Sequence, residues 1–175
     1  MGNTHSKHEY ELGIVVLGME SSGKTYLVNK MMDKNDDRPT QPTLTFGEHH
    51  YPLKGKIIRL VECGGSEQIQ QLWSHYLESI KGLIFVVDST GADKFQTAGE
   101  LLKTACLRCR DKTPILLVCT KSDLEGAVTP DEVASKMQIG DVKQPVKPIS
   151  VSAKTNQGLQ DIHAWIKATY KNKDT

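Results

Sequence analysis

Residues 18–25 of this 175-residue chain read Gly18-Met19-Glu20-Ser21-Ser22-Gly23-Lys24-Thr25. The stretch matches the pattern GxxxxGK[ST], which joins a strand to a helix in proteins that bind nucleotide phosphates. Residues 12–17, directly before it, form an apolar run without polar alternation, which is typical of a strand covered on both faces. Residues 24–32 predict a helix that begins inside the motif. The sequence therefore predicts a phosphate-binding loop, or P-loop, between a strand and a helix.

The chemistry of phosphate binding explains this spacing. Glycines let backbone N–H groups curl around a phosphate without obstruction by a Cβ atom, and the helix start adds N–H donors and a positive dipole end. Lys24 can reach the β- and γ-phosphates, and the Thr25 hydroxyl can ligate Mg²⁺. The alternative, a glycine-rich turn with a chance Lys-Thr pair, is disfavoured by the flanking strand and helix. The candidate nucleotide-binding residues here are Gly18, Glu20, Ser21, Ser22, Gly23, Lys24, Thr25 and Tyr26.

A second motif bears on the base of the nucleotide. The apolar run 115–119 ends in Thr120-Lys121-Ser122-Asp123, which resembles the base-reading NKxD motif of small GTPases with Thr in place of Asn. The Asp123 carboxylate can accept hydrogen bonds from guanine N1–H and the 2-amino group, and adenine lacks this pair of donors. The stem of Lys121 can lie over the base plane. The alternative, a solvated turn with a local salt bridge, is disfavoured by the position of the motif after a buried strand.

A third motif supports guanine. Ser152-Ala153-Lys154 follows the last predicted strand and resembles the SAK motif, in which the N–H of Ala153 would face the guanine O6. Thr120 lacks the Asn amide that ties the base-reading loop to the P-loop. Since Thr120 keeps a hydroxyl, we expect weaker nucleotide affinity rather than lost guanine specificity.

Two further segments carry candidate γ-phosphate contacts. Thr43 follows Pro42 in the position where GTPases have a threonine that ligates Mg²⁺ and senses the γ-phosphate. Thr40 is a rival, but Thr43 fits better because Phe46 follows it, as in PTxxF. In the segment 61–65, Val-Glu-Cys-Gly-Gly, we expect the Gly65 N–H to meet the γ-phosphate. An ordinary loop threonine and a flexible double-glycine turn are the alternatives. The candidate metal ligands are Thr25 and Thr43.

The remaining chain alternates between strand and helix patterns. Strands are predicted at 46–51, 56–61, 83–87, 115–119 and 146–151, with a turn at 52–55. Helices are predicted at 69–80, 95–108, 130–137 and 159–166, and a polar loop at 33–41. Pro148 places the last strand at a sheet edge. This alternation predicts an α/β fold of three layers, with a mostly parallel sheet between helices.

Several side chains are assigned to structure rather than chemistry. Trp73 and Trp165 lie on apolar helical faces and are expected in the core. Cys106 and Cys109 form a CxxC within a helical pattern, without the second ligand pair of a zinc site. The adjacent His49 and His50 have no partner motif and are interpreted as ordinary strand or loop residues.

At this point the chain resembles the Arf family of small GTPases. The resemblance lies in LWSHYLESIKGLIFVVDST, in PTLTF and in the double-glycine turn, and it extends over about residues 12–170. It implies a six-stranded P-loop GTPase domain, which we expect at 11–172 after a flexible tail at 1–10. It also implies GTP or GDP bound with Mg²⁺, GTP-dependent effectors and regulators at the switch regions, and a role in membrane or ciliary traffic. We expect a monomer.

Three departures from the family pattern affect the expected function. Glu62 stands where the family usually has Asp, and Ser66 takes the place of the Gln that positions the attacking water. Residues 2–9 contain no large apolar side chain, so the amphipathic N-terminal helix of the family is not expected. We therefore expect very slow GTP hydrolysis. A regulatory switch is the leading hypothesis, a non-hydrolysing GTP-binding module is the rival, and an ATPase or nucleotide kinase is disfavoured by the base-reading motifs.

Composition and the N-terminal sequence bear on location. A net charge of +1 argues against a nucleic-acid-binding surface, and no apolar run approaches the roughly 20 residues of a membrane span. The first six residues, MGNTHS, match the myristoylation pattern MGxxx[ST] with Gly2 as acceptor, and a single myristoyl chain binds membranes weakly and reversibly. The alternative is an unmodified tail. We expect a cytoplasmic protein, with reversible membrane association if Gly2 is acylated.

Overall fold

The computed structural model describes residues 13–32 and 43–171. Four expectations fall outside these residues: the tail at 1–10, the acylation of Gly2, the loop at 33–41 and the rival threonine Thr40. Every other candidate site residue named above lies within the described part of the chain.

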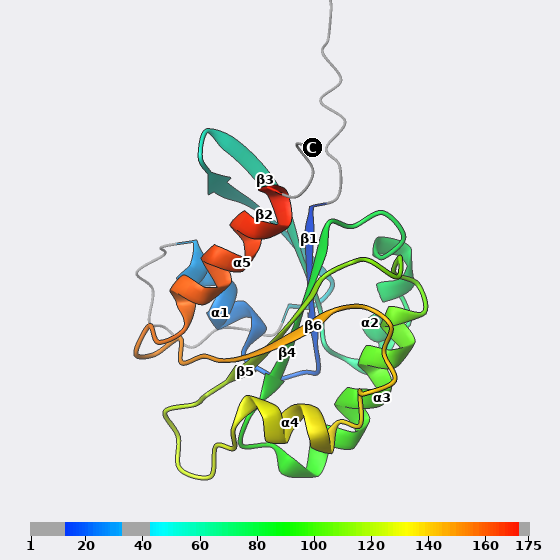
Figure 1. Cartoon of the computed structure of the whole chain (residues 1–175), viewed down its shortest axis with the longest axis vertical. Helices are drawn as coiled ribbons and strands as arrows, with labels where there is room; N and C mark the ends of the chain where they lie inside the picture. The colour runs from blue at the N-terminus through cyan, green and yellow to red at the C-terminus, as the bar shows by residue number, and fades with distance from the viewer. Residues whose placement is uncertain (1–12, 33–42, 172–175) are drawn as a thin grey trace, which may run out of the picture.

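A six-stranded sheet forms the centre of the molecule (Figure 1). Its strands are β1 (Ile14–Gly18), β2 (Phe46–Leu53), β3 (Lys56–Cys63), β4 (Gly82–Asp88), β5 (Ile115–Thr120) and β6 (Val146–Ser150). Their order is β2-β3-β1-β4-β5-β6, and only β2 runs antiparallel to its neighbour. The mostly parallel sheet is therefore confirmed. Pro148 lies in the edge strand β6, where a missing N–H costs no ladder bond on the open side.

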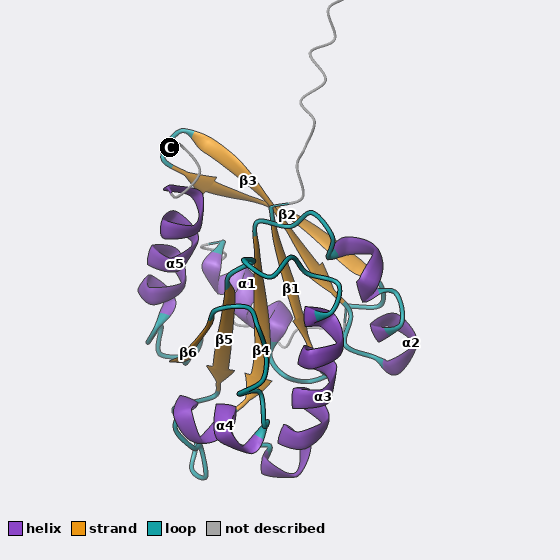
Figure 2. Ribbon diagram, turned by 45° about the vertical axis from the view of Figure 1, so that its right-hand side comes forward, coloured by secondary structure: helices purple, strands orange, loops and turns teal. Residues whose placement is uncertain are grey.

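Helices cover both faces of the sheet (Figure 2). The helices α1 (Lys24–Met31) and α5 (Leu159–Lys171) pack on one face. The other face is covered by α3 (Phe95–Cys106), α4 (Pro130–Lys136) and the short segments α2 (Glu67–Gln70) and η1 (Trp73–Tyr76). A one-turn segment, η2 (Ala92–Lys94), leads into α3. Trp73 and Trp165 belong to these two cores, as predicted. None of the described helices has the length and apolar character needed to cross a membrane.

The predicted helix at 69–80 is wrong as a single element. The chain instead forms α2, a turn and the 3₁₀ segment η1, with His75 N–H donating to the Leu72 carbonyl. The Trp73 indole N–H also donates to the Gly64 carbonyl at 3.0 Å. This bond fixes Trp73 against the double-glycine turn, and a 3₁₀ geometry still turns Trp73 and Leu77 into the core.

Of the other boundaries that differ from the prediction, two have an identifiable structural cause. The hairpin turn is shorter than expected, because β2 continues to Leu53 and β3 begins at Lys56. Lys54 and Gly55 form the turn with φ angles of 43° and 78°, the left-handed pair that suits a two-residue hairpin loop. The helix α3 ends at Cys106 rather than at residue 108. There the buried Gln144 amide donates to the Cys106 carbonyl at 2.9 Å.

Candidate functional site

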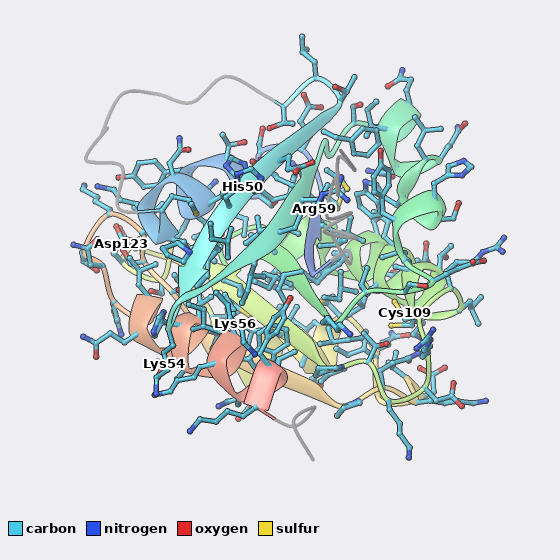
Figure 3. The ribbon with its side chains drawn as sticks, turned by 90° about the horizontal axis from the view of Figure 1, so that it is seen from above. His50, Lys54, Lys56, Arg59, Cys109 and Asp123 are labelled. Carbon is cyan, nitrogen blue, oxygen red and sulfur yellow. The ribbon has the colours of Figure 1, made fainter. Side chains whose placement is uncertain are left out.

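The candidate site lies where parallel strands end. The P-loop follows β1, the loop 121–124 follows β5, and the loop 151–158 follows β6. Because the carboxyl ends of parallel strands meet at one edge of a sheet, the three predicted motifs converge there. Figure 3 labels Asp123, which lies in the loop after β5.

The P-loop wraps closely around its own lysine. Lys24 is buried, and its Nζ donates to the carbonyls of Gly18 at 2.8 Å and Met19 at 2.7 Å. Burial lowers the pKa of Lys24 to about 8, against the opposing charge of Glu62. Gly23 caps α1 with a left-handed φ of 93°, which a glycine adopts without strain. The loop therefore holds an ammonium group inside a ring of backbone, as phosphate binding requires.

Close approach explains the other glycines of the loop region. A Cβ atom at Gly18 would lie 2.4 Å from the Val86 carbonyl oxygen. A Cβ atom at Gly65 would lie 2.4 Å from Glu20 N and 2.6 Å from Lys24 Nζ. The Glu20 N–H in turn donates to the Gly65 carbonyl at 3.1 Å. Gly65 thus lies directly against the P-loop lysine, at the end of the site where a terminal phosphate would bind.

The base-reading loop is tied to the P-loop by Thr120. Its hydroxyl lies 2.7 Å from the Ser22 carbonyl, 98 residues away, and 3.1 Å from the Val87 carbonyl. Lys121 adds a second tie, since its Nζ donates to the Ser21 carbonyl at 3.1 Å. The threonine therefore keeps the connection that an asparagine would make. It has one proton for two acceptors, whereas an asparagine amide has two.

Asp123 is held in place by the SAK motif. The Ser152 hydroxyl donates to Asp123 Oδ1 at 2.7 Å, and this bond lowers the pKa of Asp123. Ser152 is fully buried, whereas Asp123 is exposed. One carboxylate oxygen is thus anchored on the protein while the side chain faces solvent. Ala153 and Lys154 follow in the same loop.

Three oxygens meet where a metal ion is expected. The hydroxyls of Thr25 and Thr43 lie 3.0 Å apart. Both also contact Glu62 Oε1, at 2.5 Å from Thr25 and 2.9 Å from Thr43. Burial raises the pKa of Glu62, but His49 and the two threonines outweigh burial and leave the pKa lowered. The carboxylate is therefore ionised at this corner.

These donors suit Mg²⁺ with a phosphate better than a metal held by protein alone. Hydroxyl and carboxylate oxygens are hard ligands, and Mg²⁺ usually takes one or two protein oxygens besides phosphates and waters. Among residues 13–32 and 43–171, no group of three His, Cys, Asp or Glu side chains could form a complete metal cage. The residues present fit a nucleotide-bound Mg²⁺, for which Thr25 and Thr43 could supply ligands.

Four residues make contacts that the sequence analysis did not predict. His49 lies in a strand, as interpreted, and its Nε2 is 3.5 Å from Glu62 Oε2. Asp88, at the end of β4, accepts from Lys121 Nζ at 2.5 Å. Burial raises the pKa of Asp88, but the bonds from Lys121 and Thr90 outweigh it and leave the pKa lowered. The Gln70 amide donates to the Gly65 carbonyl at 2.8 Å. The Gln144 amide donates to the carbonyl of Cys106, the last residue of α3.

Ser66 occupies the first position after the double-glycine turn. It is the N-cap residue of α2, and its side chain makes no capping hydrogen bond. Its carbonyl accepts from Ile69 and Gln70. The side chain is thus short and uncommitted beside Gly65, where the family pattern has a glutamine.

Comparison with known protein families gives a match over nearly the whole chain. Residues 2–170 match the model of the ADP-ribosylation factor family. The chain is 31% identical over 167 residues to ADP-ribosylation factor-like protein 3 of Caenorhabditis elegans, covering 92% of this chain and 89% of the relative. It is 30% identical over 166 residues to ADP-ribosylation factor-like protein 2 of Arabidopsis thaliana, covering 91% and 88%.

Solved structures share the fold. The Arl6 (BBS3) small GTPase of Trypanosoma brucei, determined with the nucleotide analogue GppNp, superposes with a TM-score of 0.81 at 20% identity. The match covers 93% of this chain and 98% of that one. A structure of the mammalian SRP receptor gives a TM-score of 0.79, also at 20% identity, and covers 90% and 99%. From the family match and the two relatives, the chain belongs to the ADP-ribosylation factor family and is an Arf-like small GTPase.

Proposed function

We propose that this protein binds GTP and GDP with Mg²⁺ at the P-loop and reads the base through Asp123. The observation that carries the proposal is the bond from the buried Ser152 hydroxyl to Asp123. It joins two loops of distant sequence into one base-reading edge, and Thr120 fixes that edge to the P-loop. A carboxylate anchored in this way is complementary to guanine, whereas adenine would leave it unpaired.

Asp123→Ala tests the base assignment. We expect GTP affinity to fall by about 2 kcal/mol or more, because the change removes a charge-assisted pair of hydrogen bonds. Glu125→Ala, an exposed acidic residue on the same loop, is the matched control and should leave affinity unchanged. Competition of GTP and ATP against a fluorescent nucleotide measures both. Comparable affinity of the wild type for ATP and GTP would refute the proposed specificity.

Intrinsic GTP hydrolysis is proposed to be very slow. Hydrolysis in this class depends on positioning a water molecule in line with the γ-phosphate. The Ser66 side chain is too short to do this from its backbone position, and the Gln70 amide is bonded to the Gly65 carbonyl. Glu62 contacts Thr25 and Thr43, so it faces the metal corner. In this respect the protein acts as a long-lived GTP-bound switch.

A single-turnover assay tests the slow hydrolysis. Ser66→Gln should hydrolyse GTP as fast as the wild type or faster, while Ser66→Ala and Gln70→Ala should change little. Hydrolysis by the wild type within minutes that either alanine variant abolishes would instead make that residue catalytic. No hydrolysis in any variant, with equal effector binding of the GTP and GDP forms, would favour the second candidate: a GTP-binding module in which the nucleotide is a structural cofactor.

The cellular role is proposed from the family. We infer that residues 11–172 act as one Arf-like domain that recruits effectors and meets regulators at the segments around Thr43 and Gly65, as a monomer in membrane or ciliary traffic. The segments RLVECGGS, TKSD and LQDIHAWIKATY most resemble the divergent Arf-like protein numbered sixteen. That resemblance supports a member of the family with altered switch chemistry.

Membrane association is proposed to be reversible and to depend on Gly2. One acyl chain supports only marginal binding without a second signal, so a large cytosolic fraction is expected. Intact-mass measurement of protein from a eukaryotic host tests the acylation. A stable membrane pool of Gly2→Ala protein would show that the anchor lies elsewhere.

A further inference from the structure

A buried carboxylate connects three elements at the metal corner. Glu62, in β3, is 2% exposed, and its Oε1 contacts one hydroxyl from α1 and another from Thr43 before β2. The three oxygens form a triangle with sides of 2.5, 2.9 and 3.0 Å. No sequence motif required this contact, because the family pattern has a shorter aspartate at this position.

Two sides of the triangle match the spacing of ligands around Mg²⁺. Octahedral bonds of 2.0–2.1 Å at right angles place neighbouring ligand oxygens about 2.9 Å apart. Two sides of the triangle, at 2.9 and 3.0 Å, have this spacing, while the third, the hydrogen bond from Thr25 to Glu62, is shorter at 2.5 Å. A carboxylate that reached the metal only through water would not need to touch both threonine hydroxyls.

The charge of Glu62 is not neutralised by a neighbouring cationic side chain. Within the described residues, no lysine or arginine forms an ion pair with Glu62, and its one ion-pair partner is His49 at 3.5 Å. Lys24, which is close enough to feel its charge, directs Nζ to the carbonyls of Gly18 and Met19. The neutral hydroxyls of Thr25 and Thr43 donate hydrogen bonds to Glu62 but do not neutralise its buried charge, so this carboxylate favours a bound cation.

His49 restrains the second carboxylate oxygen. It pairs with Leu60 across the hairpin, so Glu62 is its diagonal neighbour on the same face of the sheet. Its Nε2 lies 3.5 Å from Glu62 Oε2, is buried and has no hydrogen-bond partner among the described residues. With Oε2 turned to His49, Oε1 points at the threonine hydroxyls. This arrangement matches the outer-shell contacts that orient ligands in metal sites.

We propose that Glu62 is a direct ligand of the Mg²⁺ ion, on one octahedral face with Thr25 and Thr43, and that His49 is the residue that positions it. The proposal rests on the nucleotide and Mg²⁺ binding proposed above. It differs from the family arrangement that the resemblance implies, in which the shorter aspartate acts through the water shell of the metal. The additional methylene of glutamate removes the need for that water.

Counting the waters on the metal tests the ligand. Full-length protein is loaded with Mn²⁺ and a non-hydrolysable GTP analogue, and electron paramagnetic resonance line broadening in ¹⁷O-enriched water counts bound waters. Of six octahedral positions, phosphate oxygens fill about two and the three side chains fill the next three, which leaves about one water. Glu62→Asp should hold about one water more. Glu48→Asp, the same change on exposed β2, should match the wild type.

The outcomes separate this assignment from the proposed function. Equal water numbers in the wild type and in Glu62→Asp would overturn direct ligation while leaving guanine-nucleotide binding intact. Failure of the wild type to bind the analogue would overturn the proposed function and this assignment together. One additional water in Glu62→Asp, with Glu48→Asp unchanged, would support direct ligation.

The positioning role of His49 has its own test in the same assay. His49→Phe removes the ring nitrogen and should raise the water number toward that of Glu62→Asp. His49→Gln, which keeps a polar group facing Glu62, should stay near the wild type. A His49→Phe variant with the wild-type water number would show that Glu62 needs no help from this histidine.

Discussion

Thr120 joins two loops with a single hydroxyl. Its proton is shared between the carbonyls of Ser22 and Val87, and the side chain is buried. The residue thus combines two roles: it belongs to the base-reading motif, and it holds the P-loop at the correct distance from that motif. Substitutions of similar size can measure what this hydroxyl contributes to stability and to nucleotide affinity.

Thr120→Val should lower the free energy of unfolding by about 1–3 kcal/mol, because it removes the donor from two inward-facing carbonyls. Thr120→Asn, with two amide protons, should bind nucleotide more tightly by about 1 kcal/mol. Thr104→Val, on the exposed side of α3, is the control. Urea unfolding with and without GDP measures both effects. A Thr120→Val protein with unchanged stability and nucleotide affinity would contradict the proposed tie.

The individual motif residues could be predicted from the sequence, but the contacts between them could not. The P-loop, TKSD and SAK each have a local pattern, so their residues could be named from the sequence. The contact of His49 with Glu62 depends instead on hairpin register. A turn at 52–55 would place Tyr51 opposite Lys56, whereas the two-residue turn places it opposite Ile58. Such a register would place His49 opposite Ile58, four residues from Glu62 along β3.

Among the elements, α3 and α4 pack closely through a glycine. A Cβ atom at Gly99 would lie 2.0 Å from the Met137 carbonyl oxygen and 2.8 Å from its carbon. Met137 is the C-cap residue of α4, so the clash would be with backbone and not with a flexible side chain. The small residue thus sets the distance between the two helices.

Gly99→Ala should therefore destabilise the fold by about 1–3 kcal/mol, the usual cost of overpacking a core. Gly140→Ala is the matched control, since nothing lies within 4 Å of the position of its Cβ atom. The control should be neutral or stabilising by about 0.4–1 kcal/mol, because alanine restricts the unfolded chain. The denaturant concentration at the midpoint of unfolding is measured for both variants. Equal midpoints for both variants would show that the helices move apart without cost.

The element boundaries that the sequence missed share a physical cause. Apolar spacing of three and four residues predicts a helix over 69–80, yet the chain breaks into α2 and η1. It still buries Trp73, Leu77 and Ile80, while Leu72 is exposed. The bond from Trp73 to Gly64 selects the broken form. Likewise, α3 ends where Gln144, 38 residues away, supplies a donor to Cys106. Both signals come from tertiary contacts and have no local pattern.

On the scale of the whole molecule, the sheet order brings four segments to one edge: the P-loop, the double-glycine turn, the loop 121–124 and the loop 151–158. Alternation of buried strands and helices was enough to predict the parallel sheet and its layers, because strands buried on both faces are apolar throughout. The order of the strands and the antiparallel pairing of β2 do not follow from composition. They place Glu62, at the end of β3, beside Thr25 and Thr43.

The nucleotide content of the purified protein tests whether this edge binds a guanine nucleotide with Mg²⁺. Protein purified with Mg²⁺ present is denatured, and the released nucleotides are separated by ion-pair chromatography against standards. Guanine nucleotide is predicted in near-stoichiometric amount, with GTP in excess of GDP if hydrolysis is as slow as proposed. A Lys24→Ala protein, folded but without the P-loop ammonium, should release none. Release of ATP or ADP by the wild type, or equal nucleotide from both proteins, would contradict the account.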